Sequence, residues 1–299
     1  MYKKHLAILM ASLMLSGCLA TYGGKDPSSN NGQLISYQYE FEGKKDLKTD
    51  AVFRKPASVN GKVPAVIILH DGGGWFTERT RQYGDLFTAN GYATLEPRLF
   101  YDEKATRTNK KDLASLYSAL EYLSKQPEID KNKIYVVGMS AGANLAMLAK
   151  TKMASETFNR SDTQFKAIAA LYPVCWAFMD TISGKPPRTF TDFSIANMQN
   201  WQPTPIRLFI PEFDDYDDKD TKTCDSFIEK IPSNEARSTF SVKVYAGATH
   251  GWDHGKTYSF QTSFACKGKG CTNTNQSNPT VTKQGYMDVL EFFKRNNSQ

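Results

Sequence analysis

The chain has 299 residues, of which 40% are hydrophobic and 23% are charged, a composition that suits one globular domain or two small ones. Its formal net charge is +6, and no run of Lys or Arg is long or interleaved with aromatic residues. This charge pattern argues against nucleic acid as a partner.

The first residues have the pattern of a secretory signal. Lys3 and Lys4 precede an apolar run at residues 6–15 that is too short to span a bilayer, and Cys18 follows. The ending LSGC at residues 15–18 resembles the bacterial lipobox. The resemblance implies removal of residues 1–17 and acylation of Cys18. A plain signal peptide, cut at another bond, is the alternative.

Acylation would anchor the mature protein to a membrane, because each buried CH₂ group contributes roughly 0.8 kcal/mol. Leu19, in place of an Asp, predicts sorting to the outer membrane if the cell is Gram-negative. Loss of Lys3 and Lys4 lowers the net charge from +6 to +4. We interpret residues 18–33 as a flexible tether and residues 34–299 as one domain. The prediction is thus an exported, membrane-anchored lipoprotein, and the sequence gives no indication of its oligomeric state.

Four cysteines follow Cys18, and an even number in an oxidising compartment predicts two disulfides with three possible connectivities. Cys266 and Cys271 are close enough in sequence to close a small loop, which would leave Cys175 with Cys224. No His stands near them at the spacing of a zinc site, so disulfides are favoured over metal-bound thiols. We expect neither a metal nor a cofactor.

The elements predicted in chain order alternate between strands and helices. Residues 34–41 alternate aromatic and polar side chains, as a half-exposed strand does. Short continuous apolar runs, which fit parallel strands covered on both faces, lie at residues 65–69, 134–137, 167–172 and 206–210. Leucines recur at helical spacing in residues 113–123, and apolar residues do the same in 286–293. This order predicts an α/β fold with a mostly parallel central sheet and helices on both faces.

The segment IYVVGMSAGANLAML, residues 134–148, carries the pattern Gly-x-Ser-x-Gly around Ser140. By composition alone that pattern should occur in roughly one chain in ten of this length. Its setting is more specific, because it follows a buried strand and precedes a helix, as a nucleophile elbow does. The helix N-terminus would add partial positive charge near an oxyanion. We predict Ser140 as a nucleophile; a purely structural turn is the alternative.

A serine hydroxyl needs a neighbouring base, and histidine is the usual one. His5 leaves with the signal, so His70, His250 and His254 remain. In a fold of this kind with a nucleophile elbow, the order is Ser, acid, His, each after a strand, and His250 at the end of FSVKVYAGATH fits it best. We interpret His254, four residues later, as a surface-loop residue.

The acid should lie between Ser140 and His250, after a strand. The segment PIRLFIPEFDDYDDKD offers Glu212, Asp214, Asp215, Asp217 and Asp218. Spacing from the strand favours Asp214, with Asp215 second, and the acid would orient and stabilise the imidazole. We expect the other acids to form a solvated loop or a weak cation site.

The loop HDGGG at residues 70–74 follows a predicted buried strand. An amide from such a loop and the amide after the nucleophile usually bind the oxyanion. Here these donors would be Gly72 and Ala141. A flexible turn is the alternative interpretation of the three glycines.

Together these residues resemble the dienelactone hydrolase family of the α/β-hydrolase superfamily. The matching segments run in order from LHDGGGW through VVGMSAGANLA, LYPVC and IPEFDDYDDKDTKTC to VYAGATHGWDH, over most of residues 63–255. The resemblance implies an esterase-type fold, a Ser140–Asp214–His250 triad and Asp71-Gly72 in the oxyanion loop. It also supports pairing of Cys224 with Cys175.

The sequence departs from the family in two ways. The family's founding enzymes use Cys where this chain has Ser140. Their substrate-binding arginines have no clear match, although Arg79, Arg81 and Arg98 are nearby. Dienelactone is therefore a poor candidate substrate.

The sequence thus predicts a serine hydrolase that cleaves small-molecule carboxylic esters through an acyl-enzyme. An insertion at residues 175–205 could form a cap, and its aromatic residues could line the pocket or pack in the core. These residues are Trp176, Phe178, Phe190, Phe193 and Trp201. The rival interpretation is a catalytically idle domain of the same fold that acts as an envelope binding module. A complete Ser, Asp and His set argues against it.

Overall fold

The computed structural model describes residues 32–58, 61–75, 77–100, 108–185, 190 and 192–297. The predicted signal at 1–17, the acylation site Cys18 and the tether up to residue 31 lie outside the described residues.

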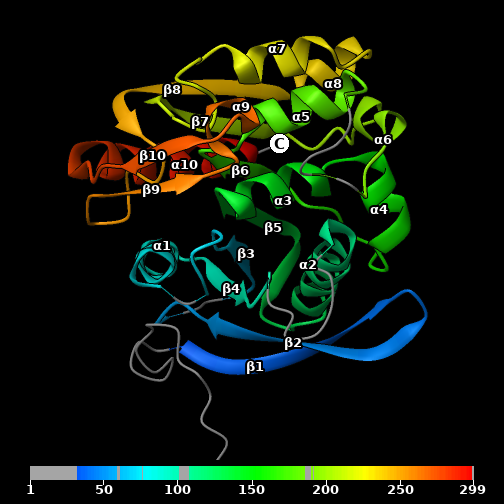
Figure 1. The fold of residues 1–299 in the computed structure, drawn as a ribbon. Coiled ribbons are helices and arrows are strands. Elements are labelled where there is room, and N and C mark those ends of the chain that lie inside the picture. The colour runs from blue at the N-terminus through cyan, green and yellow to red at the C-terminus, as the bar shows by residue number, and fades with distance from the viewer. Residues whose placement is uncertain are drawn as a thin grey trace, which may run out of the picture.

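An eight-stranded sheet forms the centre of the molecule, in the order β1-β2-β4-β3-β5-β6-β7-β8 (Figure 1). Its strands are β1 (Gly32–Phe41), β2 (Lys44–Arg54), β3 (Val63–Leu69), β4 (Ala93–Pro97), β5 (Ile129–Met139), β6 (Ile168–Leu171), β7 (Ile206–Phe213) and β8 (Phe240–Thr249). The six neighbouring strands β4-β3-β5-β6-β7-β8 pair in parallel, whereas β2 pairs antiparallel with both β1 and β4. The mostly parallel sheet confirms the predicted fold class.

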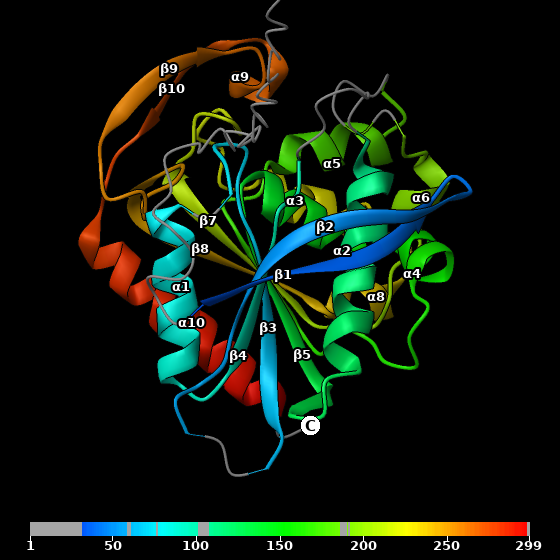
Figure 2. The ribbon, with the colours of Figure 1, turned by 90° about the horizontal axis from the view of Figure 1, so that it is seen from below.

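Helices cover both faces of the sheet (Figure 2). They are α1 (Glu78–Ala89), α2 (Asn109–Ser124), α3 (Ala141–Ala149), α4 (Lys152–Phe158), α5 (Cys175–Ile182), α6 (Ile195–Gln199), α7 (Thr223–Glu229), α8 (Asn234–Ser238), α9 (Ala265–Gly268) and α10 (Pro279–Asn297). The side chains of α1 and α10 join one hydrophobic core, and those of α2, α3 and α5 join another on the opposite face. A separate hairpin of β9 (Tyr258–Thr262) and β10 (Cys271–Asn275) stands beside the strand ends.

Strand β3 shows why the central strands are continuous apolar runs. Ala65, Ile67 and Leu69 pack in the core under α2 and α3, whereas Val66 and Ile68 pack in the core under α1 and α10. Successive side chains of a strand point to opposite faces, so a sheet with two cores needs apolar residues at every position. Both the predicted strand and its double burial are confirmed.

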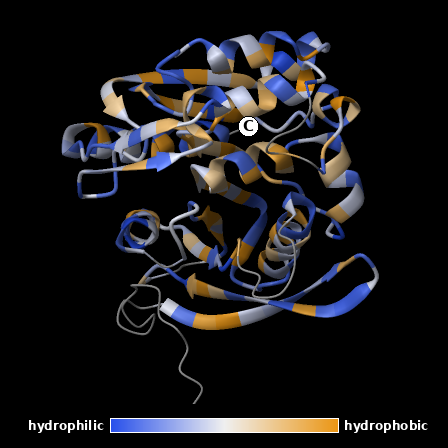
Figure 3. Cartoon of the chain, viewed as in Figure 1, coloured by the Kyte–Doolittle hydropathy of each residue, from blue (hydrophilic) through white to orange (hydrophobic). Residues whose placement is uncertain are grey.

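Strand β1 lies at the edge of the sheet and alternates, as its sequence predicts. Tyr37 is buried while its neighbours Ser36 and Gln38 are exposed, and Figure 3 shows the mixed hydropathy of this edge hairpin. The strand begins at Gly32, because Gly32 and Gln33 pair with β2. The predicted tether therefore extends two residues too far, since backbone pairing continues past the last apolar side chain.

The insertion at residues 175–205 is more ordered than predicted. It contains α5 and α6, and its aromatic side chains belong to the same hydrophobic core as side chains of α2 and α3, in agreement with the core-packing alternative. These buried residues are Trp176, Phe178, Phe190, Phe193 and Trp201. Within the part of the chain that the structure describes, no helix has the length and hydropathy that a bilayer crossing requires.

Candidate active site

A sharp turn at Ser140 joins β5 to α3. Ser140 has φ 51° and ψ −111°, which non-glycine residues rarely adopt. A Cβ atom at Gly138 would lie 2.2 Å from the carbonyl oxygen of Gly142, and one at Gly142 would lie 2.3 Å from the carbonyl oxygen of Leu69. Close backbone packing therefore requires both glycines, and the resulting turn presents the Ser140 hydroxyl at the end of β5.

Three side chains from separate loops form one hydrogen-bonded chain. Nε2 of His250 lies 2.8 Å from Oγ of Ser140, and Nδ1 of His250 lies 3.0 Å from Oδ2 of Asp214. Ser140, Asp214 and His250 follow β5, β7 and β8, so all three lie at the carboxyl ends of parallel strands. With the Nδ1 proton donated to the carboxylate, Nε2 is left to accept the serine proton.

Aromatic rings enclose the imidazole. The ring of Tyr216 lies 4.4 Å from that of His250, and the ring of Tyr172 meets it edge-on at 4.9 Å. His250 and Asp214 are each only 4% exposed. The rings therefore restrict the imidazole to one orientation and keep bulk water from the His250–Asp214 pair.

The remaining acids after β7 have other contacts. Asp215 accepts a hydrogen bond from the amide of Thr274 at 2.8 Å, so Asp214 and not Asp215 contacts His250. Glu212 accepts from the amide of Gly247. Asp218 forms a 3.7 Å ion pair with Lys269. Of the two acids that the sequence offered, Asp214 and Asp215, the structure thus places Asp214 next to His250.

Asp217 is buried, contrary to the expectation of a solvated loop. Its carboxylate accepts hydrogen bonds from the amides of Trp176 at 2.7 Å and Cys175 at 3.0 Å, at the start of α5. Burial raises the pKa of Asp217 to about 8, and the charge of Asp214 adds to this rise. Asp217 therefore ties the acid loop to the insertion.

His70 has a structural role beneath the glycine loop. Its Nδ1 donates to the carbonyl oxygen of Asp71 at 2.7 Å, and its Nε2 accepts from the amide of Leu99 at 3.2 Å. This pair of contacts needs a neutral ring, and burial lowers the pKa of His70 to about 4. His70 is thus not placed to act as a base.

The interpretation of His254 as a surface-loop residue is wrong. Its side chain is only 13% exposed, and Nε2 lies 3.3 Å from Oδ2 of Asp71. Nε2 also contacts Nη1 of Arg79, and Nδ1 lies 2.9 Å from the hydroxyl of Tyr258. Asp71 and Arg79 are distant from His254 in sequence, so the sequence around His254 does not indicate that it is buried.

The glycine loop after β3 lies against the N-terminus of α3. A Cβ atom at Gly142 would lie 2.6 Å from the carbonyl oxygen of His70, two residues before Gly72. The loop is further held by Asp71, whose Oδ1 accepts from the amide of Gly73 at 2.9 Å. Gly72 and Ala141, the predicted oxyanion donors, therefore belong to two segments packed against each other beside Ser140.

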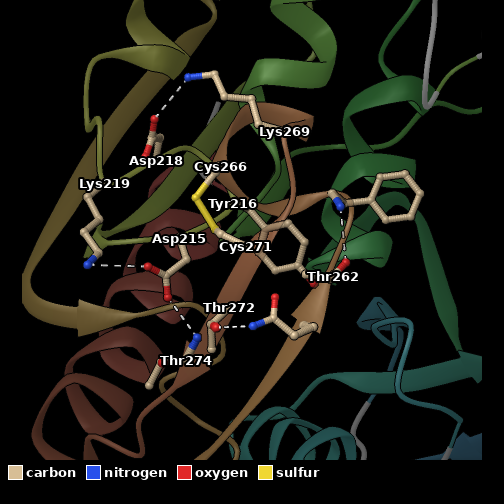
Figure 4. Close-up of a disulfide and its surroundings, with 12 residues drawn as sticks. Asp215, Tyr216, Asp218, Lys219, Thr262, Cys266, Lys269, Cys271, Thr272 and Thr274 are labelled. Carbon is tan, nitrogen blue, oxygen red and sulfur yellow. Dashed lines mark hydrogen bonds and ion pairs between the residues drawn. A yellow bond between two sulfur atoms is a disulfide. The ribbon is translucent and has the colours of Figure 1, made fainter.

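The loop that carries the acid is braced by the β9–β10 hairpin (Figure 4). The amide of Cys266 donates to the carbonyl oxygen of Asp215 at 2.7 Å, next to the Asp215–Thr274 hydrogen bond. A disulfide joins Cys266 to Cys271 across the hairpin. The hairpin therefore holds the chain immediately after Asp214.

Both expected disulfides are present. The second joins Cys175 of α5 to Cys224 of α7. These two sulfur atoms lie close to Asp217, in a group that resembles a metal site, but both are already bonded in the disulfide. They therefore have no thiolate to offer a metal ion.

Sequence reasoning missed most of the residues around the triad. The sequence suggested no role for Arg79, which has no clear match in the family, or for Tyr172, Tyr216 and Asp253. Tyr172, Tyr216 and Asp253 lie in the motif segments LYPVC, FDDYDDKD and VYAGATHGWDH, so their position close to the site could have been inferred. The contacts of Arg79 depend on tertiary packing alone.

Comparisons with known proteins agree with this architecture. Residues 53–200 match the family model BD-FAE. No curated protein sequence matches the chain.

Solved structures of the same fold cover nearly the whole domain. Est1E from Butyrivibrio proteoclasticus has a TM-score of 0.59 and 15% identity, over 88% of this chain and 99% of that one. The esterase Est2 from Thermogutta terrifontis has a TM-score of 0.59 and 15% identity, over 88% and 91%. A Klebsiella pneumoniae protein assigned as a dienelactone hydrolase has a TM-score of 0.60 and 14% identity, over 88% and 99%. The chain therefore has the α/β-hydrolase fold, and residues 53–200 match the BD-FAE family model.

Proposed function

We propose that this chain is a serine hydrolase that cleaves small-molecule carboxylic esters through an acyl-enzyme. The observation that carries the proposal is the continuous hydrogen-bonded chain from Oγ of Ser140 through His250 to Asp214. The proposal is further supported by similar structures, of which one is named an esterase and another a dienelactone hydrolase.

The geometry supports a two-step acyl transfer. Oγ of Ser140 attacks the ester carbonyl carbon while its proton passes to Nε2 of His250. The amides of Gly72 and Ala141 stabilise the oxyanion, and Asp214 stabilises the imidazolium. Collapse of the intermediate breaks the bond to the alcohol oxygen, which takes the proton from Nε2.

Water completes the cycle by the same route in reverse. It attacks the acyl carbon, gives a proton to Nε2, and the second tetrahedral intermediate expels Oγ of Ser140, which recovers that proton. The products are the carboxylic acid and the free enzyme. No step draws on a metal or a cofactor.

A fluorophosphonate probe on the purified domain, compared with Ser140→Ala, tests the proposal. Labelling of the wild type alone, with turnover of p-nitrophenyl, aryl or sugar esters, is the expected result. No labelling of the wild type, or equal labelling of Ser140→Ala, would instead favour the idle binding module. The ester panel also identifies the preferred acid and alcohol.

We also propose that the mature protein is anchored through acylated Cys18. The proposal is supported by the lipobox-like LSGC and by two disulfides, which form in oxidising compartments. Metabolic labelling with an alkyne analogue of palmitate should tag the wild type and not Cys18→Ala. Tagging of both would reject acylation at Cys18, and release of the wild type into the soluble fraction would reject anchoring.

A further inference from the structure

One buried guanidinium lies where the loops around the active site meet. Arg79 is in the first turn of α1, and its side chain is 4% exposed. Its Nη2 lies 2.6 Å from Oδ2 of Asp71, and its Nη1 lies 3.9 Å from Oδ1 of Asp253. Nη1 also donates to the hydroxyl of Tyr172 at 3.3 Å. Each of these partners belongs to a different loop.

The contact with Asp71 reaches the proposed oxyanion donor. One oxygen of Asp71 binds Arg79 while the other accepts from the amide of Gly73, so the carboxylate closes a tight turn around Gly72. Burial acts to raise the pKa of Asp71, but the charge of Arg79 and a hydrogen bond from His254 hold it well below its usual range. The Asp71 carboxyl group is therefore ionised at neutral pH, and both of its oxygens are bound.

The contact with Asp253 reaches the proposed base. Asp253 lies three residues after His250 and accepts from the hydroxyl of Tyr172 at 2.8 Å. The Tyr172 ring is the one that meets the His250 imidazole edge-on. Arg79 thus sits between the loop that would hold the oxyanion and the turn that carries the base.

We propose that Arg79 is a positioning residue that sets the Gly72 loop relative to His250, and so aligns the oxyanion site with the attacking serine. This inference rests on the proposed function. It assigns Arg79 no contact with substrate: the guanidinium acts through Asp71 on one side and through Asp253 and Tyr172 on the other.

The competing explanation is that Arg79 only stabilises the fold. A second buried ion pair in the chain serves as a matched control for this explanation. Arg54 of β2 and Glu96 of β4 form another buried pair, with an Nη1–Oε2 distance of 3.8 Å and side chains 2% and 0% exposed. Breaking a buried pair destabilises a protein wherever the pair lies. Loss of Arg54 should therefore cost stability without acting on the Gly72 loop.

The experiment measures kcat per active site, with sites titrated by a fluorophosphonate, for Arg79→Met, Arg79→Lys, Asp71→Asn and Arg54→Met. We expect kcat per site to fall about 10- to 100-fold in Arg79→Met with KM nearly unchanged, because misplacing a transition-state donor acts on kcat. Lys should restore only part of the loss, since one ammonium cannot bind both carboxylates in the fork geometry. Arg54→Met should keep wild-type kcat per site, with a lower Tm.

A double-mutant cycle tests whether Arg79 acts through Asp71. The effects of Asp71→Asn and Arg79→Met on kcat should be strongly non-additive, because each breaks the same contact. Wild-type kcat per titrated site in both Arg79 variants, or additive losses, would overturn the inference. Asp71→Asn keeps the test decisive if Arg79→Met does not fold. Failure of the proposed function itself would show differently, as activity that survives Ser140→Ala.

Discussion

Replacing Gly142 with alanine should separate the two segments that form the proposed oxyanion site. The new Cβ would lie 2.3 Å from the carbonyl oxygen of Leu69, which is backbone and cannot rotate away. Ordinary carbon–oxygen contact requires α3 and the end of β3 to move apart by roughly 1 Å. Misplacement by that amount lowers a rate by about 100-fold, and overpacking costs about 1–3 kcal/mol of stability.

The measurement is kcat for a p-nitrophenyl ester together with the Tm of Gly142→Ala. Each kcal/mol should lower Tm by about 2–4 °C in a domain of this size. Gly285→Ala in α10 is the matched control, because its Cβ would lie 3.7 Å from Nε1 of Trp252, which is an ordinary contact distance. It should keep wild-type kcat and gain about 0.5–1 kcal/mol from better helix propensity. Wild-type kcat and Tm in Gly142→Ala would refute the packing argument.

Three further outcomes follow from the structure. Asp214→Asn should lower kcat by about 10⁴-fold, whereas Asp215→Asn should lower it far less; equal losses in steady-state assays would contradict the assignment of the acid. Since burial lowers the pKa of His70 to about 4 from an unfolded value near 6.5, its stabilising contribution is complete above pH 6.5 and lost as pH falls to 4. The free energy of unfolding, measured by urea titration, should therefore fall by up to about 3 kcal/mol between pH 6.5 and pH 4. His70→Gln should remove this part of the pH dependence, and an unchanged pH dependence in the variant would contradict the assignment to His70. Replacing the 175–224 disulfide by serines should lower the free energy of unfolding by about 4 kcal/mol, and replacing the 266–271 disulfide should lower it by about 2 kcal/mol, because the first closes a longer loop. A larger loss for the 266–271 variant in denaturant titrations would contradict this reasoning.

The elements that sequence predicts well are those whose cause is local. Strand β3 is apolar at every position because it lies between two cores, and Gly138 is required by a backbone contact with Gly142, four residues later. The order of Ser140, Asp214 and His250 is a property of the chain itself. For these features pattern and structure agree.

The rest depends on contacts between distant segments. His254 looks like a loop residue because its partners Asp71, Arg79 and Tyr258 come from three other elements. Trp176 has the size and chemistry of either a pocket wall or a core residue, and only packing decides between them. Sequence therefore located Ser140, Asp214 and His250 better than it located the residues that surround them.

The β9–β10 hairpin has a consequence for when activity can arise. It contacts Asp215 through Thr274 and reaches His254 through Tyr258, yet it lies near the end of the chain. Since a protein is synthesised from its N-terminus, a nascent chain that already displays Ser140 still lacks the braces of its acid and base. The proposed ester cleavage would therefore start only after the C-terminal segments have emerged, and a prematurely terminated product would be inert toward the esters around it.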